Sequence, residues 1–363
     1  MSKDDWSIVV GIKRYPTFPR LKGPENDAMA FNDWLLDKAG GDVPKEQITL
    51  ILSSHFPEAA HVSKEEPTEE RIDLAFRRFV DLSDESIANG RGPRVGRRLY
   101  VYMAGHGLQI EQFEERFAVL LTANATKSVP AHVYPKAWVE HLRLSGAFDQ
   151  TVLLLDACRE PLTNVPPNRP IIVGRWVDPV PRGARWLIGH ASQDRRTAYE
   201  KPFGPDEERD VHAIFSRALL AGLRGAAPRD TNGNVTAATL SDYVRENMRE
   251  LLSADEKTRW DVNTEPQMDP GGDGELILAS FPRAEFKVEV RVKPDVAGRT
   301  VRILASDLRT TVFSKVVAEG EQALTLSLPV GLYSAEVLDG GQAPAPFLVA
   351  GLSSEEVTHV VLG

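Results

Sequence analysis

Short apolar runs without polar alternation recur along the first three quarters of the chain. Two of them, Leu99–Ala104 and Val152–Leu155, are built only from Leu, Val, Tyr, Met and Ala. Runs of this kind are typical of strands buried on both faces, as in a parallel sheet. The remaining strands expected on this basis are Ser7–Gly11, Ile48–Leu52, Phe117–Leu121, Trp186–Gly189 and Glu275–Ala279.

Between these runs, apolar residues recur at the three- and four-residue spacing of an amphipathic helix. After Thr68, for example, Ile72, Phe76 and Phe79 fall on one helical face. Helices are expected on this basis at Pro24–Leu36, Thr68–Leu82, Ala137–Leu144, Val211–Leu223 and Leu240–Leu252. Strands that alternate with helices predict an α/β sandwich with a mostly parallel sheet.

The pattern changes near residue 284. Over Phe286–Lys293 apolar and charged residues alternate, which is the period of a half-buried strand. Further short β-type runs follow at Val301–Leu304, Val312–Val317, Leu324–Leu328, Tyr333–Leu338 and Val357–Leu362. Gly, Pro and Asp separate these runs, and no helical pattern appears. We therefore predict two domains, a larger α/β domain over 1–281 and a small all-β, sandwich-like module over 284–363.

Composition narrows the class of protein. A chain of 363 residues with 42% hydrophobic content suits two globular domains. No apolar stretch is long enough for a transmembrane helix, and Met1–Trp6 lacks the apolar segment of a signal peptide. The single cysteine excludes an intrachain disulfide and fits a reducing compartment, so we expect a cytoplasmic protein. A net charge of −9 argues against general nucleic-acid binding.

Candidate chemistry stands where two of the predicted strands end. His106 follows the run that starts at Leu99, and the only cysteine, Cys158, follows the run that starts at Val152. The carboxyl ends of parallel strands share one edge of a sheet, where open α/β folds place their sites. An imidazole beside a thiol favours the nucleophilic thiolate. We therefore predict a Cys158–His106 dyad, with the amides of Gly107 and Cys158 as the oxyanion hole.

Each member of this pair also has a plainer interpretation. A lone cysteine at a strand end is often a small buried hydrophobe, which would apply to Cys158. His106 would then be a turn residue between two glycines. No spacing typical of metal ligands is present, and one cysteine cannot build a thiolate zinc site. We expect neither a metal site nor a cofactor.

The two motifs and their separation resemble those of a known family. Tyr-x-x-Gly-His-Gly ends at Gly107, Asp-x-Cys-Arg ends at Arg159, and the reactive residues are 158 − 106 = 52 positions apart. In caspases the histidine lies about 50 residues before the cysteine. Over residues 5–281 the chain resembles the caspase-like cysteine peptidases, and it is most similar in motif to the bacterial metacaspase- and paracaspase-like members. Further segments that carry this resemblance are Leu21–Ala28, Gly189–Gln193, Thr197–Glu200 and Phe215–Leu220.

The resemblance implies a fold and a specificity. The expected fold is the caspase-like α/β/α sandwich. Asp156 occupies the position where caspases have Gln, and relatives with Asp there accept Arg or Lys before the cleaved bond. By the same resemblance Asp27 and Glu200 join the acidic pocket, and Ser192 contacts the substrate. Without the resemblance, Asp27 would be a helix-start residue and Glu200 a solvated loop residue.

The activity that the resemblance implies is that of a cysteine endopeptidase. It would cleave proteins after Arg or Lys through an acyl-enzyme intermediate, with no cofactor required. Dependence on calcium stays open, because the chain has no obvious acidic calcium cluster. Two alternatives remain: a catalytically silent scaffold with the same fold, and an esterase or acyltransferase that uses the same dyad. Intact His106 and Cys158 argue against the scaffold, and the acidic pocket residues favour a peptide with a basic side chain over an ester.

The segment after the candidate nucleophile suggests regulation. Glu160–Arg185 contains six prolines and no periodicity, which is typical of a functional or flexible loop. In caspase-like enzymes cleavage or ordering of this region helps to build the substrate pocket, so we expect a latent enzyme with an activating protein or protease. The expected cleavage sites are Arg175, Arg182 and Arg185, with Arg195 and Arg196 as further candidates. The plainer interpretation is a flexible surface loop.

Overall fold

The computed structural model describes most of the chain, in thirteen segments. These are residues 3–112, 115–163, 184–192, 200–203, 211–230, 232–252, 257–258, 265–281, 285–305, 309–329, 331–338, 344–349 and 357–362. The chain divides into two compact units, residues 1–281 and 282–363. The predicted boundaries were 1–281 and 284–363.

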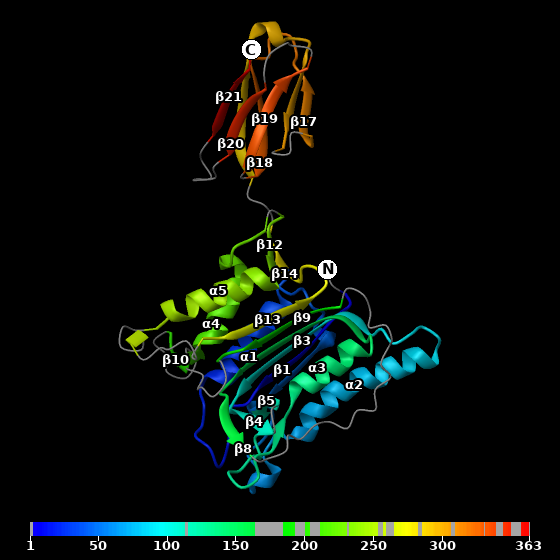
Figure 1. The fold of residues 1–363 in the computed structure, drawn as a ribbon, viewed down its shortest axis with the longest axis vertical. Helices are drawn as coiled ribbons and strands as arrows, with labels where there is room; N and C mark the ends of the chain where they lie inside the picture. The colour runs from blue at the N-terminus through cyan, green and yellow to red at the C-terminus, as the bar shows by residue number, and fades with distance from the viewer. Residues whose placement is uncertain are drawn as a thin grey trace. The chain divides into compact units, whose positions relative to one another are not determined.

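A six-stranded sheet forms the centre of the first unit (Figure 1). Its strands, in spatial order, are β13 (Gln267–Gly272), β9 (Arg185–His190), β7 (Phe148–Ala157), β3 (Gly96–Gly105), β1 (Asp5–Gly11) and β2 (Ile48–Leu52). All neighbouring pairs are parallel except β13 with β9, which is antiparallel. The mostly parallel sheet predicted from the unbroken apolar runs is therefore confirmed.

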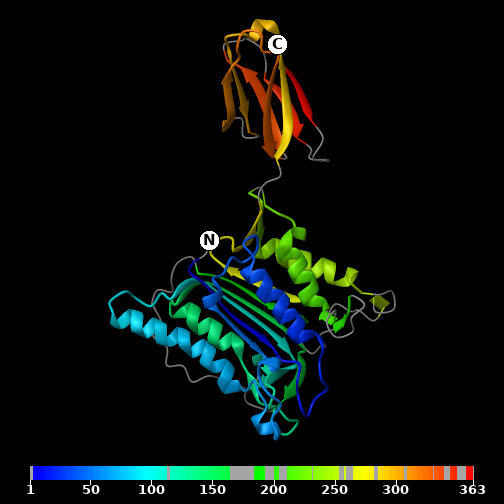
Figure 2. The same ribbon diagram turned by 180° about the vertical axis from the view of Figure 1, so that it is seen from behind.

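Helices cover both faces of this sheet, as Figures 1 and 2 show from opposite sides. One core contains residues of α1 (Gly23–Leu36), α4 (Ile214–Ala221) and α5 (Ala237–Glu250). The core on the other face contains residues of α2 (Glu69–Ala88) and α3 (Pro135–Leu144). The first unit is an α/β/α sandwich, as predicted.

Alternation along β3 explains why both faces are buried. Tyr102 points toward α1, where Phe31 stacks on its ring at a centroid distance of 4.8 Å. Its neighbours Val101 and Met103 point to the opposite face, where Phe76 of α2 stacks on Trp138 of α3 at 5.5 Å. Burial of each such side chain stabilises the fold by roughly 1.5–3 kcal/mol. A strand of this kind has no solvent face, so it reads as a continuous apolar run.

A smaller sheet continues from the carboxyl edge of the large one. Its order is β6 (His132–Val133), β5 (Glu115–Leu121), β4 (Gly107–Gln112) and β8 (Glu160–Thr163). The sequence analysis predicted β5 but missed β4 and β8, because both are short and mix polar with apolar residues. β4 begins directly after His106, and β8 begins two residues after Cys158. The small sheet therefore anchors the backbone that follows each candidate catalytic residue.

The expected helix at Val211–Leu223 begins three residues late. Val211–Ala213 forms β11, which pairs antiparallel with β10 (Glu200–Pro202), and α4 starts only at Ile214. The helical spacing of apolar residues continues into β11, so periodicity alone did not locate this boundary. After α4, residues Gly222–Ala226 form a π-helical turn. Short elements complete the unit: β12 (Asn234–Thr236), β14 (Ile277–Ser280), and 3-10 turns at Lys45–Gln47, Ser53–His55 and Val62–Lys64.

The second unit contains only β-strands and one 3-10 turn, Pro294–Val296, in its described residues. One sheet has the order β18 (Ala323–Pro329), β15 (Glu285–Val292), β21 (Thr358–Leu362). The other has the order β17 (Thr311–Val316), β16 (Thr300–Leu304), β19 (Gly331–Val337), β20 (Ala345–Val349). Both sheets contribute to one core, for example through Val290 and Ile303. The all-β prediction is confirmed, although the sequence analysis missed β20.

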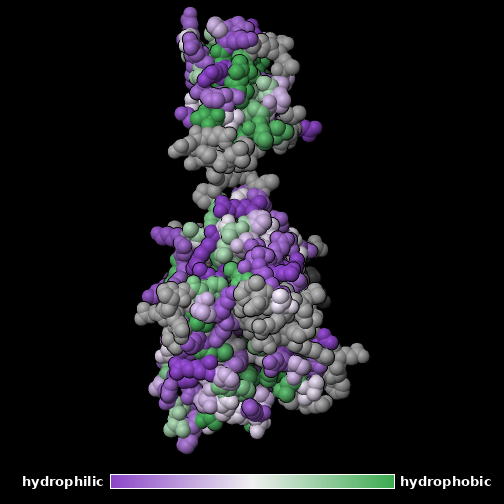
Figure 3. All heavy atoms as spheres, turned by 90° about the vertical axis from the view of Figure 1, so that its left-hand side faces the viewer, coloured by the Kyte–Doolittle hydropathy of each residue, from purple (hydrophilic) through white to green (hydrophobic). Residues whose placement is uncertain are grey.

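The visible surface of the second unit has hydrophobic patches among polar side chains (Figure 3). Its exposed large hydrophobic residues are Val312, Val316, Leu332, Leu348 and Val361.

In the described part of the chain, no helix has the length and hydropathy needed to cross a membrane.

Candidate active site

The pairing of β3 with β7 brings His106 and Cys158 to the same edge of the sheet. Gly105, the last residue of β3, pairs with Ala157, the last residue of β7. His106 and Cys158 are the next residues of the two strands. Neighbouring strands lie about 5 Å apart, so the two side chains start from adjacent backbone positions. Both residues line one cavity of about 150 Å³.

The imidazole of His106 is held by a loop that precedes α1. Its Nε2 lies 2.8 Å from the carbonyl oxygen of Pro19. A carbonyl oxygen only accepts, so this contact assigns the proton to Nε2 and leaves Nδ1 as the basic nitrogen of the neutral ring. The ring also packs edge-on against Tyr15 at 4.7 Å and beside Phe18 at 5.8 Å. These contacts fix the orientation of the base.

The two glycines that flank His106 allow close packing around it. A Cβ atom on Gly105 would overlap the hydroxyl of Tyr15, and one on Gly107 would lie 2.7 Å from the carbonyl oxygen of Cys158. Gly107 pairs with Leu120 of β5, and the amide of Leu121 donates to the carbonyl of His106 at 2.8 Å. In an antiparallel ladder this pattern makes Gly107 a residue whose N–H points away from the partner strand. The pairing with β5 therefore leaves the Gly107 amide for another acceptor.

Tyr15 supports the histidine of the candidate dyad. Its hydroxyl accepts from the backbone N–H of His106 at 3.0 Å and donates to the carbonyl of Leu121 at 3.1 Å. Burial raises the pKa of Tyr15 far above its ordinary value, and the nearby Cys158 sulfur, when negatively charged, raises this pKa further. The phenol therefore stays protonated at neutral pH and keeps both hydrogen bonds.

Asp156 faces the same side of the sheet as Cys158, because side chains two residues apart in a strand share a face. That side is covered by α1 and α4. The Asp156 carboxylate is 4% exposed and accepts a short hydrogen bond from the hydroxyl of Ser216. Tyr102 and Ser216 are in turn linked through their hydroxyls at 2.6 Å. The Asp156 carboxylate is thus the final acceptor of a buried hydrogen-bonded chain that runs from the Tyr102 hydroxyl through the Ser216 hydroxyl.

Asp27 reaches the same cavity from the first turns of α1. It is 1% exposed and accepts two hydrogen bonds, from Nδ1 of His212 at 2.7 Å and from the backbone N–H of Ala213 at 2.9 Å. Both donors belong to β11. The late start of α4 therefore has a function in the site, since β11 supplies the partners that hold Asp27.

Glu200 forms the exposed rim of the cavity. Its carboxylate accepts from the backbone N–H of Gly23 at 2.9 Å and of Lys22 at 3.3 Å, at the amino end of α1. Unbonded N–H groups and the helix dipole make this end favourable for negative charge. Asp27, Asp156 and Glu200 line one cavity together with His106 and Cys158.

The proximity of these carboxylates changes their protonation. Burial raises the pKa of Asp156 to about 8, and the neighbouring charge of Asp27 contributes to that shift. Burial also raises the pKa of Asp27, while the hydrogen bond from His212 opposes the shift. An empty cavity therefore holds fewer than three negative charges at neutral pH. A cation that enters it would be accompanied by proton release.

The remaining predicted residues lie elsewhere. Ser192 is buried just after β9, where its carbonyl accepts from Arg159 at 3.3 Å, and it is not among the residues that line the cavity. Arg185 is the first residue of β9, paired with Gln150 on one side and Gly272 on the other, so cleavage after it would require the sheet to open. The other expected cleavage sites, Arg175, Arg182, Arg195 and Arg196, lie outside the described residues.

Four positions near the site were missed by the sequence analysis. Tyr15, Pro19, His212 and Ser216 support the dyad or the carboxylates through the contacts given above. A backbone carbonyl such as that of Pro19 leaves no residue-type signal. His212 lies in a segment interpreted for its apolar spacing, and Ser216 in one interpreted for that spacing and for the family resemblance, so neither was named as a site residue. Among the described residues, no group of three or more His, Cys, Asp and Glu side chains is arranged to hold a metal ion.

Comparisons with known proteins give one relative by sequence. The chain is 26% identical over 325 residues to a probable protease from a Desulfuromonadales bacterium, a match that covers 84% of this chain and 37% of that protein. The chain thus spans just over a third of the length of this relative. No family model matches the chain.

Two solved structures are similar to 77% of the chain. Caspase-1 from Spodoptera frugiperda is 12% identical, with a TM-score of 0.46 and 93% of that chain covered. A protein from Geobacter sulfurreducens is 11% identical, with a TM-score of 0.45 and 98% of that chain covered. Over most of its own length the chain is similar to a protein named as a probable protease, and its first unit has the α/β/α architecture expected of a caspase-like peptidase.

Proposed function

We propose that the chain is a cysteine endopeptidase of the caspase-like type that cleaves proteins after Arg or Lys. The observation that supports this most directly is that Cys158, His106 and three carboxylates line a single cavity. The similarity to a protein named as a probable protease favours the same class of reaction.

The proposed chemistry follows from the positions of the two catalytic residues. Nδ1 of His106 takes the proton of the Cys158 thiol, and the sulfur attacks the carbonyl carbon of the substrate. The negative charge that develops on the carbonyl oxygen is stabilised by the amides of Gly107 and Cys158. His106 then protonates the leaving amine, an acyl-enzyme remains on the sulfur, and water releases it.

The proposed preference for a basic residue rests on charge. Asp156 and Asp27 are buried, and Glu200 lies at the rim, so a guanidinium in the cavity would meet carboxylates from several directions. An acidic side chain in the same place would be repelled and would lose its hydration. Arg fits such a site better than Lys, because its planar fork can bind two carboxylate oxygens at once.

The proposal also covers the setting of the enzyme. The reaction needs a reduced thiol, which favours the cytoplasm. The substrates are proteins with Arg or Lys at the cleaved bond. The enzyme is proposed to be latent until it is activated. The activating partner or protease would act on the segment between β8 and β9 or on the segment after Ser192.

The test is cleavage of matched fluorogenic peptides that differ only in the residue before the cleaved bond. We expect Arg peptides to exceed Asp peptides in kcat/KM by at least about 1000-fold, since loss of a buried charge partner costs roughly 3–5 kcal/mol. Cys158→Ala and His106→Ala should each reduce cleavage by several orders of magnitude. Efficient cleavage after Asp would refute the specificity, and activity within tenfold of wild type in either variant would refute the dyad.

A matched ester substrate separates the peptidase from an esterase or acyltransferase. If only the ester is turned over, the endopeptidase proposal fails although the dyad stands. If neither substrate reacts, and Cys158 does not bind a thiol-directed probe that carries Arg, the chain is a silent scaffold. The probe should be applied to the purified full chain, both directly and after limited digestion with trypsin, to allow for latency.

A further inference from the structure

The first unit has a second cavity at the opposite end of β3 from the candidate active site. Its volume is about 390 Å³, and it is bordered by the start of β3, by the loop Lys38–Asp42 after α1, and by β14. Arg98, near the start of β3, precedes His106 by eight residues. At about 3.3 Å per residue the two lie roughly 26 Å apart, so this cavity is separate from the catalytic one.

A buried cation borders this cavity. Arg98 is 3% exposed, and its guanidinium donates to the side-chain oxygen of Gln150, to the hydroxyl of Tyr100 and to the carbonyl oxygen of Ile277. All three acceptors are neutral. Within the described segments, no carboxylate lies at ion-pair distance from this guanidinium. Burial of a charge without a counter-ion is unfavourable, and a bound anion would remove that penalty.

The adjacent arginine shows the contrast. Arg97 forms a two-pronged ion pair with Asp5, which is fully buried. Arg97 is thus partly exposed and forms an ion pair with a carboxylate of the protein, whereas Arg98, the next residue of the strand, is buried beside a cavity without one. This contrast identifies Arg98, and not its neighbour, as the residue available to an anionic ligand.

Two donors near the cavity are not used by the contacts of these residues. The bonds above occupy four of the five N–H groups of Arg98. Tyr100 is 1% exposed and accepts from Arg98 at 2.6 Å, so its own hydroxyl hydrogen remains to be donated. No acceptor for that hydrogen is assigned among the residues that the structure describes. Together, an N–H and an O–H can bind two oxygens of one carboxylate or phosphate group.

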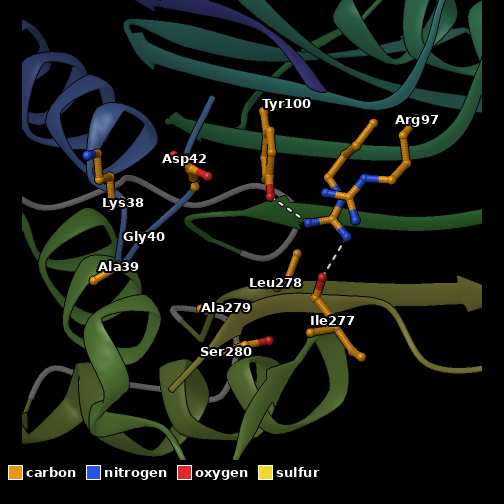
Figure 4. A pocket seen from close by; sticks show the side chains of 12 residues that line it. Lys38, Ala39, Gly40, Asp42, Arg97, Tyr100, Ile277, Leu278, Ala279 and Ser280 are labelled. Carbon is orange, nitrogen blue, oxygen red and sulfur yellow. Dashed lines mark hydrogen bonds between the residues drawn. The ribbon is translucent and has the colours of Figure 1, made fainter. Parts of the chain in front are cut away.

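The side chains that line this cavity carry a net positive charge, which complements an anion. Figure 4 shows Arg97 and Tyr100 extending from β3 and Ile277 from β14, with Lys38 and Asp42 on the other side. Basic side chains outnumber acidic ones among the lining residues, since Asp42 is the only acidic member of that set. Leu278, Ala39 and Ala279 add apolar wall. The cavity is larger than a bare oxyanion needs, which favours a ligand with an organic part.

We propose that this cavity, here called the β3–β14 cavity, binds a small organic anion through its phosphate or carboxylate group, with Arg98 and Tyr100 as the main donors and Lys38 on the rim. The site is independent of the proposed peptidase activity. A ligand there would contact β3, β14 and the loop after α1 at once, so it would stabilise the folded first unit.

The test is calorimetric titration of the full chain with three probes: adenosine 5′-monophosphate, citrate and inorganic phosphate. We expect at least one organic anion to bind with a Kd below about 1 mM, more tightly than inorganic phosphate, and to raise the melting temperature. Tighter binding of the nucleotide would indicate an organic phosphate as the natural ligand, and tighter binding of citrate a carboxylate. Both results support the proposal.

Variants locate the binding. Tyr100→Phe keeps the ring and removes one donor, so the Kd should increase by about 10- to 100-fold. Lys38→Ala, at an exposed position, should weaken binding by about 3-fold, whereas the exposed control Lys45→Ala should leave it unchanged. Arg98→Gln should abolish binding; if that variant does not fold, the other two variants carry the test.

Three results would overturn the proposal. The first is that no probe binds in the millimolar range. The second is that Tyr100→Phe and Lys38→Ala bind as tightly as the wild type. The third is that inorganic phosphate binds at least as tightly as both organic anions. The cavity would then hold an adventitious ion only. Cys158→Ala should bind the probes with unchanged affinity, because the two sites are separate; loss of binding in that variant would also count against the proposal.

Discussion

The hydroxyl of Ser216 donates a short hydrogen bond to the carboxylate of Asp156 at the base of the candidate specificity pocket. Ser216 is fully buried on α4, and Asp156 is near the end of β7, so one side chain connects a helix of the outer layer to the strand that carries the candidate nucleophile. This bond lowers the pKa of Asp156 against the opposing effect of burial.

We therefore expect Ser216→Ala to weaken binding of basic substrates. Without the hydroxyl the ionised form of Asp156 loses a donor, and its pKa should rise further. The KM for an Arg peptide should increase about tenfold, with a smaller change in kcat. Ser216→Thr keeps the hydroxyl and serves as the control. An unchanged KM in Ser216→Ala would show that the bond has no role in the pocket.

The protonation of Asp156 predicts a pH effect on binding. With a pKa near 8 in the empty cavity, Asp156 is mostly neutral at pH 7, and a guanidinium favours its ionised form. Affinity for Arg should therefore increase as pH rises from 6 to 8 and level off above. Calorimetry of Cys158→Ala with an Arg-ended peptide, in two buffers of different ionisation enthalpy, measures the protons released. Release should disappear in Asp156→Asn.

The same pKa shift predicts an effect on stability. In the unfolded chain an aspartate ionises near pH 4, whereas in the folded chain Asp156 keeps its proton up to about pH 8. The folded state binds more protons across this window, so this group lowers the free energy of unfolding as pH rises from 4 to 8. Asp156→Asn should remove that loss and be more stable than the wild type at pH 8. Urea unfolding at pH 5 and pH 8 tests this: the advantage of the variant should be larger at pH 8, and equal stabilities at both pH values would contradict the assignment.

Tyr15 should act as a positioning residue for His106. Tyr15→Phe removes the hydrogen bonds to the His106 amide and to the Leu121 carbonyl while it keeps the aromatic packing. We expect kcat to fall by about 10- to 100-fold with little change in KM, because the base loses its orientation and the pocket is untouched. Tyr243→Phe, on α5, is a matched control. A purely structural role would lower the melting temperature and leave kcat per folded molecule unchanged.

His212 should tune the pocket through Asp27. His212→Phe removes the donor at 2.7 Å from Asp27, and the pKa of Asp27 should rise because that hydrogen bond opposes the effect of burial. The KM for Arg peptides should increase by about 3- to 10-fold at pH 7 and recover partly at pH 9. Absence of any recovery at high pH would indicate lost packing rather than altered protonation.

The parts of the fold that were predictable from sequence are those in which one face or both faces of an element are buried. The run Leu99–Ala104 lies between two helical layers and reads as apolar throughout, so its strand was predicted. The helix of Ile72, Phe76 and Phe79 was predicted because only one side of it is buried. Elements that depend on a partner strand, such as β4 and β8, carry no such periodicity, and at β11 the apolar spacing of the following helix hid the strand.

The candidate site shows the same division. His106 and Cys158 follow from strand ends and were named from the sequence, and Asp156 was named from the family resemblance. The partners that orient them include a backbone carbonyl, that of Pro19, and a phenol from a distant loop, that of Tyr15, and only the folded chain brings these together. Ser192 was expected to contact the substrate by the resemblance, but its carbonyl accepts from Arg159 and it is not among the residues that line the cavity.

The acidic cavity is assembled from α1, β7 and β10, whereas the candidate dyad comes from two neighbouring strands. Two of the three carboxylates of this cavity, Asp27 and Glu200, are thus far in sequence from both dyad residues, whereas Asp156 precedes Cys158 by two positions. Under the proposed function, a substitution at Asp27 or Glu200 would alter which side chain is accepted while the strand pairing that sets Cys158 beside His106 stays intact. The proposed specificity would then be open to change by single mutations outside the two strands that carry the dyad.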